Sequence, residues 1–306
     1  MKPPFNLIHS PEIGVVEHVT DGLRVVTAGN ASPMTFTGTR THILGEGDVA
    51  VIDPGPDDPS HFAALCTALN GQRVSHVIVT HSHVDHSPLA KRLAQKFDAP
   101  VLGFGPSHAG RSAVMDTLAR QGGLGGGEGI DADFAPDVLL EHGAIIEGNG
   151  WSLEAIHTPG HLSNHLCFAW LGNDALFSGD HVMGWATTLV SPPDGDLTQF
   201  MESLRKLQNR PEHTYYPGHG APLLEAHNML DYLLAHRLGR EDQILAELVS
   251  GPTDIQNITT KIYSDIDQRL LPMASRNVLA HIIDLVERGR VQPLGALRVD
   301  SQFQLV

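Results

Sequence analysis

Short runs of apolar and β-branched residues, separated by turns rich in glycine and aspartate, occupy the first hundred residues of the chain. These runs predict strands over residues 14–19, 23–28, 41–44, 49–53, 77–80 and 100–104. Between them, apolar residues recur with helical spacing, which predicts a helix capped by Ser60 and continuing to Leu69, and a second helix over 87–97. Because strands and helices alternate, the pattern predicts a layered α/β domain.

The regular pattern is interrupted between residues 103 and 129. The stretch from Gln121 to Gly129 is glycine-rich, and it lacks the Lys-Ser/Thr ending of a phosphate-binding loop. We expect a mobile surface loop here, with an active-site lid as the alternative. Predicted strands then resume at residues 138–140, 144–146, 153–156, 165–170 and 174–177, followed by a helix over 197–207.

From Ala226 onward, the pattern of apolar residues changes from alternating strands and helices to helices alone, followed by a hairpin. From there the apolar residues keep helical spacing to about Val249, and shorter helices are expected over 255–263 and 272–288. Residues 289–303 are expected to form a hairpin. Three helices followed by a small hairpin are typical of a winged helix. The sequence therefore predicts two domains, residues 1–225 and residues 226–306.

Composition narrows the class of protein. The chain has 306 residues, of which 41% are hydrophobic and 18% charged, as expected of a folded globular protein. The first eleven residues have no continuous apolar segment, so no signal peptide is expected, and no apolar run reaches transmembrane length. These features predict a cytoplasmic protein without membrane contact. Cys66 and Cys167 are interpreted as small buried residues.

The net charge bears on possible partners. It is −15, and two bound divalent cations would change it to about −11, since each adds two positive charges. A surface of this sign disfavours nonspecific binding of nucleic acid. It does not exclude a local basic track in the C-terminal domain. Eight residues could contribute to one, or could lie on a solvated face among acidic side chains: Arg237, Arg240, Lys261, Arg269, Arg276, Arg288, Arg290 and Arg298.

The candidate chemistry begins where the predicted strand over 77–80 ends. His81, His83, Asp85 and His86 follow one another as His-x-His-x-Asp-His. In an extended backbone His81 and His83 point to the same face and can bind one ion, whereas Asp85 and His86 can reach a second. Imidazole and carboxylate groups suit zinc, or iron or manganese where those are available.

Two complete coordination shells require further ligands, and candidates follow later turns. His161 follows Thr-Pro-Gly, Asp180 follows Phe-Ser-Gly, and His219 follows Tyr-Pro-Gly. Asp53 ends an earlier strand, where it either orients a metal ligand or initiates a turn. His157 is interpreted as support for the turn before His161. The role of His165 is left open between substrate contact and orientation of a ligand.

In this order, these motifs resemble the five motifs of the metallo-β-lactamase superfamily, and the C-terminal pattern resembles the winged-helix module of its lactamase-beta-2-like branch. The resemblance implies an αββα sandwich followed by a small winged-helix-like domain. It implies one ion held by His81, His83 and His161, and a second held by Asp85, His86 and His219. Asp180 would bridge the two ions, and Asp85 would orient a hydroxide between them.

This resemblance implies a hydrolase with two divalent ions, preferably zinc, that cleaves an ester or thioester of a small molecule or acyl carrier. Two alternatives are a metal-dependent endoribonuclease, which uses the winged helix to hold RNA, and a regulatory binding protein with structural metals. His83 argues against the flavodiiron relatives, which usually have glutamate at this position. Sulfur dioxygenases lack the winged helix, whereas glyoxalase-II-like thioesterases share the motif set. Nothing in the sequence indicates an oligomeric state.

Overall fold

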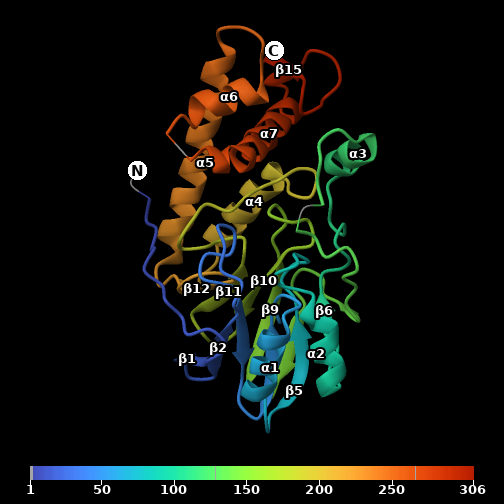
Figure 1. The fold of residues 1–306 in the computed structure, drawn as a ribbon, viewed down its shortest axis with the longest axis vertical. Coiled ribbons are helices and arrows are strands. Elements are labelled where there is room, and N and C mark those ends of the chain that lie inside the picture. Colours follow the sequence, from blue (N-terminus) through green and yellow to red (C-terminus); the bar gives the residue numbers. More distant parts are fainter. Residues whose placement is uncertain (1–2, 128, 266) are drawn as a thin grey trace.

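Two β-sheets pack face to face in the N-terminal part of the computed structural model, which describes residues 3–127, 129–265 and 267–306 (Figure 1). The first sheet has seven strands, antiparallel from β1 to β4 and parallel from β4 to β7. In spatial order they are β1 (Val16–Thr20), β2 (Leu23–Thr27), β3 (Arg40–Leu44), β4 (Asp48–Ile52), β5 (Arg73–Ile78), β6 (Val101–Gly103) and β7 (Val138–Leu139).

The second sheet has five strands, and only β11 and β12 run parallel to each other. In spatial order they are β12 (Thr214–Pro217), β11 (Ala175–Gly179), β10 (Leu166–Trp170), β9 (Trp151–His157) and β8 (Ile145–Gly148). Side chains of both sheets, including Leu44, Ile52 and Phe168, form the fully buried core between them.

Helices cover the outer face of each sheet. The helices α1 (Pro59–Ala68) and α2 (Leu89–Phe97) pack on the first sheet through residues such as Leu65 and Leu93. The helices α4 (Leu197–Gln208) and α5 (Ala226–Leu248) pack on the second sheet. These four layers confirm the predicted αββα sandwich. The N-cap of α1 is Asp58, whose carboxylate accepts from the Ser60 N–H at 2.7 Å, so the prediction of Ser60 as the cap was wrong.

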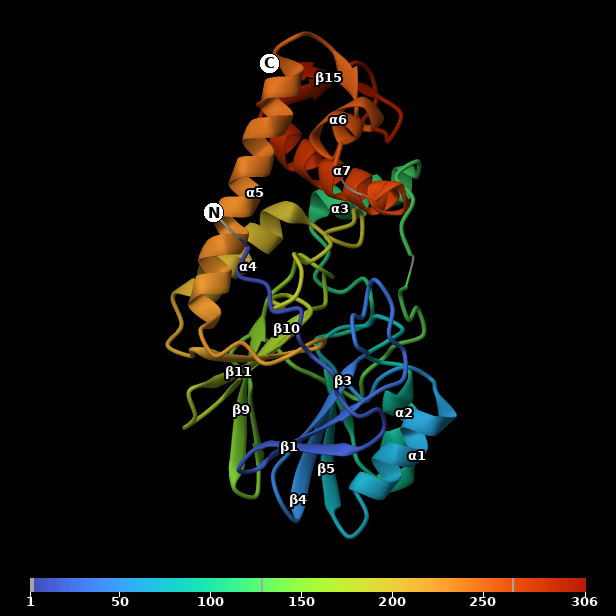
Figure 2. The same ribbon diagram turned by 60° about the vertical axis from the view of Figure 1, so that its left-hand side comes forward.

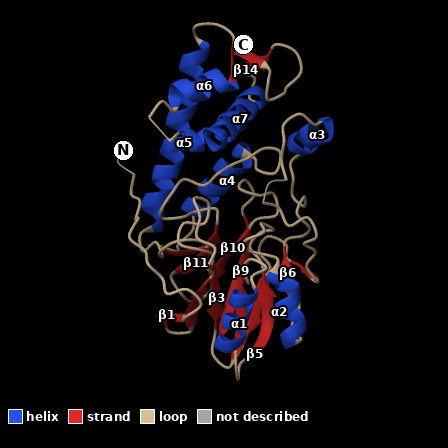
Figure 3. Cartoon of the chain, viewed as in Figure 1, coloured by secondary structure: helices blue, strands red, loops and turns tan. Residues whose placement is uncertain are grey.

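The C-terminal helices form a separate cluster beyond the sheets (Figure 3). It contains α6 (Ile255–Ile262), a 3-10 turn (Gln268–Leu270), α7 (Leu271–Glu287) and a small sheet of β13 (Thr253–Asp254), β15 (Gln302–Leu305) and β14 (Val291–Pro293). This arrangement confirms the predicted winged helix.

The helix α5 contributes to two cores, and Figure 2 shows it extending from beside α4 to the C-terminal helices. Met229, Leu230 and Leu233 in its first half belong to the core against the second sheet. Ile244 and Leu248 in its second half belong to the core of the winged helix. The boundary between residues 225 and 226 stays a prediction.

The segment that interrupts the regular pattern contains a helix that was not predicted. Within residues 103–129 the chain forms α3 (Ala113–Gln121), whose N-cap Ser112 accepts from the Met115 N–H at 3.3 Å. Met115, Leu118 and Leu124 are buried in the core of the winged helix. The loss of regular pattern between residues 103 and 129 therefore hid a short helix. The loop expected from Gln121 to Gly129 begins where α3 ends, and its mobility stays a prediction. Residue 128, which that prediction included, lies outside the described residues.

The remaining expectations concern membranes and thiols. Among the described residues, no helix combines the length and apolar character needed to cross a membrane. Cys66 is half-buried and Cys167 is fully buried, and the two are not joined in a disulfide. Burial raises the pKa of the Cys167 thiol to about 12, which agrees with its interpretation as an unreactive packed residue. The cytoplasmic location stays a prediction.

Candidate metal centre

The predicted ligands lie at the carboxyl ends of strands from both sheets. The turn after β5 carries His81, His83, Asp85 and His86, and β9 leads to His161. Asp180 directly follows β11, and His219 follows β12. Because these strand ends meet at one edge of the sandwich, all seven residues come together in two groups that share Asp180.

The first group consists of His81, His83, His161 and Asp180, whose candidate ligand atoms all lie within 4.8 Å of one another. His83 Nδ1 is 2.9 Å from His81 Nε2 and 3.0 Å from His161 Nε2. Asp180 Oδ2 is 3.7 Å from His161 Nε2. Three imidazole nitrogens thus face a common point, with a carboxylate beside it.

The second group consists of Asp85, His86, Asp180 and His219 and is equally compact. His219 Nε2 is 3.1 Å from Asp85 Oδ2, 3.2 Å from His86 Nε2 and 3.4 Å from Asp180 Oδ2. Since Asp180 faces His161 in one group and His219 in the other, its carboxylate lies between the two clusters.

The outer ring nitrogens explain how the histidines are oriented. His161 Nδ1 donates to Leu189 O at 2.8 Å, and His219 Nδ1 donates to Gly38 O at 3.2 Å. His86 Nδ1 lies 3.0 Å from the Asp53 carboxylate. Because these oxygens only accept, the rings carry their proton on the outer nitrogen and direct the Nε2 lone pair inward. Neighbouring lone pairs repel unless a proton or cation lies between them, so these residues fit metal ions.

The pKa values of the histidines differ between the two ligand groups. Burial lowers the pKa of His81, His83 and His161, that of His83 to about 3, which keeps these imidazoles neutral. Burial also disfavours charge on His219, but Asp180 and Asp85 outweigh it and raise its pKa to about 9. The carboxylates therefore favour positive charge in the second group, which a metal cation also supplies.

Asp53 supports both groups from behind. It directly follows β4 with a positive φ of 52°. Its carboxylate accepts from the Thr80 N–H at 2.7 Å and from the Thr80 hydroxyl at 2.8 Å, in addition to its contact with His86. Thr80 Oγ1 lies 2.9 Å from His81 Nδ1. The contact required by the orienting interpretation of Asp53 is thus present.

The structure separates the roles of His157 and His165. His157 Nε2 donates to Ser163 O at 3.0 Å and its ring stacks on Phe104, so it supports the turn, as predicted. His165 lies behind the metal-binding groups, where its Nε2 accepts from the Asp180 N–H at 3.3 Å. Its Nδ1 lies 2.9 Å from Thr158 Oγ1. His165 is therefore a residue that positions Asp180.

A cavity of about 550 Å³ opens above the two groups. His83, Asp85, His161 and Asp180 reach its floor. Val84 lies between two of these ligands, and Gly129 ends the glycine-rich stretch for which an active-site lid was the alternative. The other lining residues come from more distant segments: Met34, Thr35, Leu189, Ser191, Asp194, Pro272, Met273 and Arg276. Most of the surface of the cavity is apolar, and its volume is typical of a small-molecule site.

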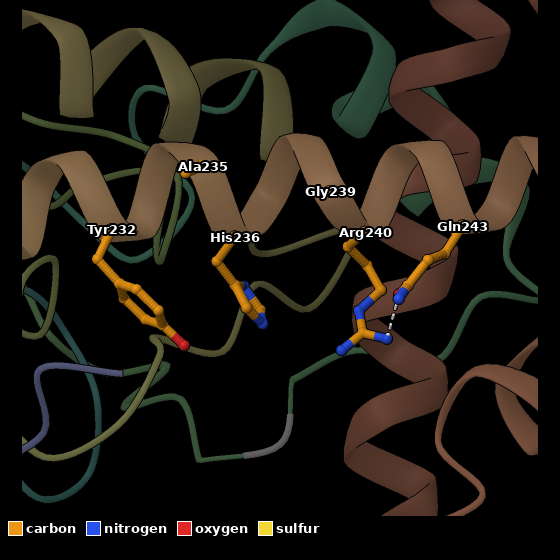
Figure 4. A pocket seen from close by; sticks show the side chains of 6 residues that line it. All are labelled: Tyr232, Ala235, His236, Gly239, Arg240 and Gln243. Carbon is orange, nitrogen blue, oxygen red and sulfur yellow. Dashed lines mark hydrogen bonds between the residues drawn. The ribbon is translucent and has the colours of Figure 1, made fainter. Parts of the chain in front are cut away.

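A smaller hollow of about 230 Å³ lies along α5 (Figure 4). Tyr232, His236 and Arg240 point to the same side of the helix there, and Arg240 donates to Gln243 Oε1 at 2.7 Å. Arg240 also lies over the Tyr263 ring. None of these residues belongs to the two histidine–aspartate groups.

Half of the eight residues considered for a basic track pair with carboxylates in the described part of the chain. Lys261 pairs with Glu247, Arg269 with Asp267, Arg288 with Glu241 and Asp284, and Arg298 with Asp300. Arg237 is buried, where it donates to Thr188 O and Asn277 Oδ1. This favours the interpretation of a solvated face among acidic side chains.

Comparison with known families agrees with this geometry. The profile described as "Metallo-beta-lactamase superfamily" matches residues 36–219, and the "Beta-lactamase associated winged helix domain" matches residues 255–297. The chain belongs to the metallo-β-lactamase superfamily, a superfamily of metal-dependent hydrolases, and carries its associated winged-helix domain.

Individual relatives extend over most of the chain. The "Beta-lactamase-like protein 2 homolog" of Drosophila melanogaster is 30% identical over 292 residues, covering 92% of this chain and 93% of the relative. The "Atrochrysone carboxyl ACP thioesterase" of Aspergillus fumigatus is 29% identical over 246 residues, which cover 78% of this chain and 67% of the relative.

Solved structures show the same fold. A β-lactamase domain protein from Burkholderia ambifaria superposes with a TM-score of 0.78 at 20% identity, covering 97% of this chain and 95% of that one. The metallo-β-lactamase family protein TTHA1429 from Thermus thermophilus superposes with a TM-score of 0.75 at 22% identity, and the superposition covers 94% of this chain and 100% of that one. Both resemblances include the C-terminal domain.

Proposed function

We propose that this chain is a binuclear zinc hydrolase that cleaves thioesters of a small molecule or acyl carrier. The observation that supports this most directly is the pair of compact ligand groups sharing Asp180 beneath a largely apolar cavity. His81, His83 and His161 would hold one ion, Asp85, His86 and His219 would hold the other, and Asp180 would contact both.

Bound divalent cations supply a polarised carbonyl and a water that is nucleophilic at neutral pH. The chain itself contributes position and proton transfer. Asp85 lines the cavity, so its carboxylate lies beside the space that water and substrate would share. We assign Asp85 the task of orienting the water and accepting its proton. As the water oxygen bonds to the acyl carbon, the carbon–sulfur bond breaks and that proton passes to the departing thiolate.

The cavity favours an acyl substrate over RNA. The proposed ions would neutralise Asp85 and Asp180, and Asp194 is paired with Arg111, so the charge of the cavity does not decide between the two substrates. Its remaining lining is mainly apolar, which suits an acyl group. The relative from Aspergillus fumigatus is named as a thioesterase acting on an acyl carrier protein, which agrees with this choice.

Elemental analysis of untagged protein, combined with hydrolysis assays on a panel of acyl thioesters and a single-stranded RNA, tests the proposal. We expect about two zinc ions per chain, with thioester turnover that a chelator abolishes and added zinc restores. Asp85→Asn should lower kcat about 100-fold or more, since it removes the proton acceptor. The control Asp300→Asn alters a carboxylate that is 78% exposed in the winged helix and should retain activity.

Other results would point to other functions. Cleavage of RNA without thioester turnover would indicate the endoribonuclease. Metal retention without hydrolysis of any substrate would indicate a regulatory binding protein. A single iron per chain would contradict the binuclear zinc assignment, and full activity in Asp85→Asn would contradict the role of Asp85.

A further inference from the structure

The roof of the cavity comes from the winged-helix domain. Pro272, Met273 and Arg276 lie in the first turns of α7, and they line the same cavity as His83 and Asp180. The floor and the roof therefore belong to regions matched by two different family profiles, residues 36–219 and 255–297. A substrate that reaches the metal-binding groups lies beneath α7.

Polar contacts fix this roof in place. Arg276 Nε donates to Ser191 Oγ at 2.8 Å, and its terminal nitrogens donate to Leu124 O and Pro192 O. Asp194, on the same rim, accepts from Arg111 at 2.8 Å and from the Gly127 N–H at 2.6 Å. These bonds join α7 to the loop over 185–196 and to the segment that follows α3, so the roof has a defined position above the floor.

The chemistry of the cavity changes from floor to roof. Carboxylates and imidazoles form the floor, whereas Met34, Val84 and Leu189 form apolar walls. Met273 and Pro272 continue the apolar surface above them. Met273 is half-buried, and its flexible thioether side chain adapts to the shape of an apolar partner. A substrate with its reacting carbonyl at the floor would therefore place an apolar body against the roof.

We propose that the first turn of α7 selects the acyl group, and that Met273 is a specificity-determining residue for substrates with an extended apolar acyl chain. This inference rests on the proposed thioesterase function and adds a substrate class to it. It assigns the winged-helix domain a part in substrate recognition at the active site. Met273 takes no part in bond making or breaking.

The test compares octanoyl and acetyl thioesters of the same small thiol, N-acetylcysteamine, using the full metal-loaded chain. Met273→Ala should lower the octanoyl-to-acetyl ratio of kcat/KM about tenfold, because apolar contact with the longer chain is lost. The loss should appear mainly as a higher KM for octanoyl, since the contact is made equally in the ground and transition states. Acetyl turnover should stay within about twofold.

Two further variants keep the test independent of folding defects. Met273→Leu conserves volume and apolar character and should keep the ratio within about threefold. Leu294→Ala removes a side chain that is 49% exposed in the same domain and does not line the cavity, so it should leave both substrates unaffected.

The outcomes separate this inference from the proposed function. If Met273→Ala lowers octanoyl and acetyl turnover equally, or leaves the ratio unchanged, selection by α7 is wrong while thioester hydrolysis stands. If the metal-loaded parent chain hydrolyses neither thioester, the proposed function fails and this inference fails with it. A reduced ratio in Met273→Ala with an unchanged ratio in Leu294→Ala supports both.

Discussion

At the scale of single residues, Gly218 shows how little space surrounds the second ligand group. A Cβ added there would lie 2.5 Å from Asp180 Oδ1 and 2.6 Å from His86 Cε1. Gly218→Ala should therefore displace two proposed ligands and lower both zinc content and kcat/KM, the latter about 100-fold. Elemental analysis and steady-state kinetics measure the two effects.

The matched control is Gly239→Ala, at a position where an added Cβ meets nothing within 4 Å. It should retain metal and activity, because alanine is favourable within a helix. Normal zinc content in Gly218→Ala would show that Asp180 and His86 are less tightly constrained than the contacts indicate.

His61 provides a prediction about pH. It is buried in α1 with its Nε2 2.9 Å from Thr41 Oγ1, and burial lowers its pKa from 6.5 to about 4. Between these values the unfolded chain binds the proton and the folded chain does not, so stability falls as pH decreases from 6.5 toward 4. When the pH is lowered from 7 to 5, the free energy of unfolding of the unsubstituted protein (the parent) should fall by about 2 kcal/mol more than that of the His61→Gln variant.

Urea unfolding at both pH values, with a chelator present throughout, isolates this effect from metal release. The control His18→Gln replaces an exposed histidine of β1, so it accounts for the loss of a histidine without the loss of a buried one. Parallel pH dependences for His61→Gln and the parent would show that His61 does not remain neutral in the folded state.

Sequence predicted the candidate ligands better than their surroundings. His81, His83, Asp85 and the later ligands occur in short motifs at strand ends, where local pattern and side-chain chemistry are both informative. The oxygens that orient His161 and His219 belong to the backbones of Leu189 and Gly38. Any residue type carries such a carbonyl, so sequence alone does not identify it.

At the scale of elements, α3 shows why one helix was missed. It has only nine residues and is followed by a run of glycines, so its local periodicity is weak. Met115 and Leu118 are buried against residues such as Ile282, which lie far away in the chain. Tertiary burial of this kind stabilises a helix too short to be stable alone.

This explanation predicts a large effect at Leu118, which is 5% exposed. Leu118→Ala should lower the free energy of unfolding by about 2–4 kcal/mol, because it leaves a cavity in the core of the winged helix. On the same helix, the Arg120 side chain is 72% exposed and pairs with Asp116. Arg120→Ala should cost less than about 0.5 kcal/mol. Equal costs in denaturant unfolding would mean that α3 does not dock as described.

At the scale of the whole molecule, the predicted order of layers and the winged helix are both confirmed, but the packing between them could not be predicted. Periodicity identified the long helix α5, yet periodicity does not state which core each turn of a helix enters. Its first half completes the core on the second sheet, and its second half completes the winged helix.

A chain ending at residue 225 should therefore fail to fold stably, because it lacks Met229, Leu230 and Leu233 and exposes the apolar surface that they cover. A chain ending at residue 240 retains those residues and should be recovered in a larger soluble fraction with more native secondary structure. Sedimentation of the expressed protein and circular dichroism compare the two. Equal solubility and secondary structure would show that the sandwich does not need α5.

The place of α5 in the sequence also affects how the protein folds as it is synthesised. Every proposed metal ligand lies at or before His219, so all of them leave the ribosome before the side chains of α5 that cover the second sheet. The ligands are then available while the sandwich still lacks its last outer layer. A nascent chain paused at this stage would expose both coordinating groups and apolar surface. Because a preformed metal site requires the folded sandwich, stable capture of metal should follow completion of α5, although the ligands are translated first.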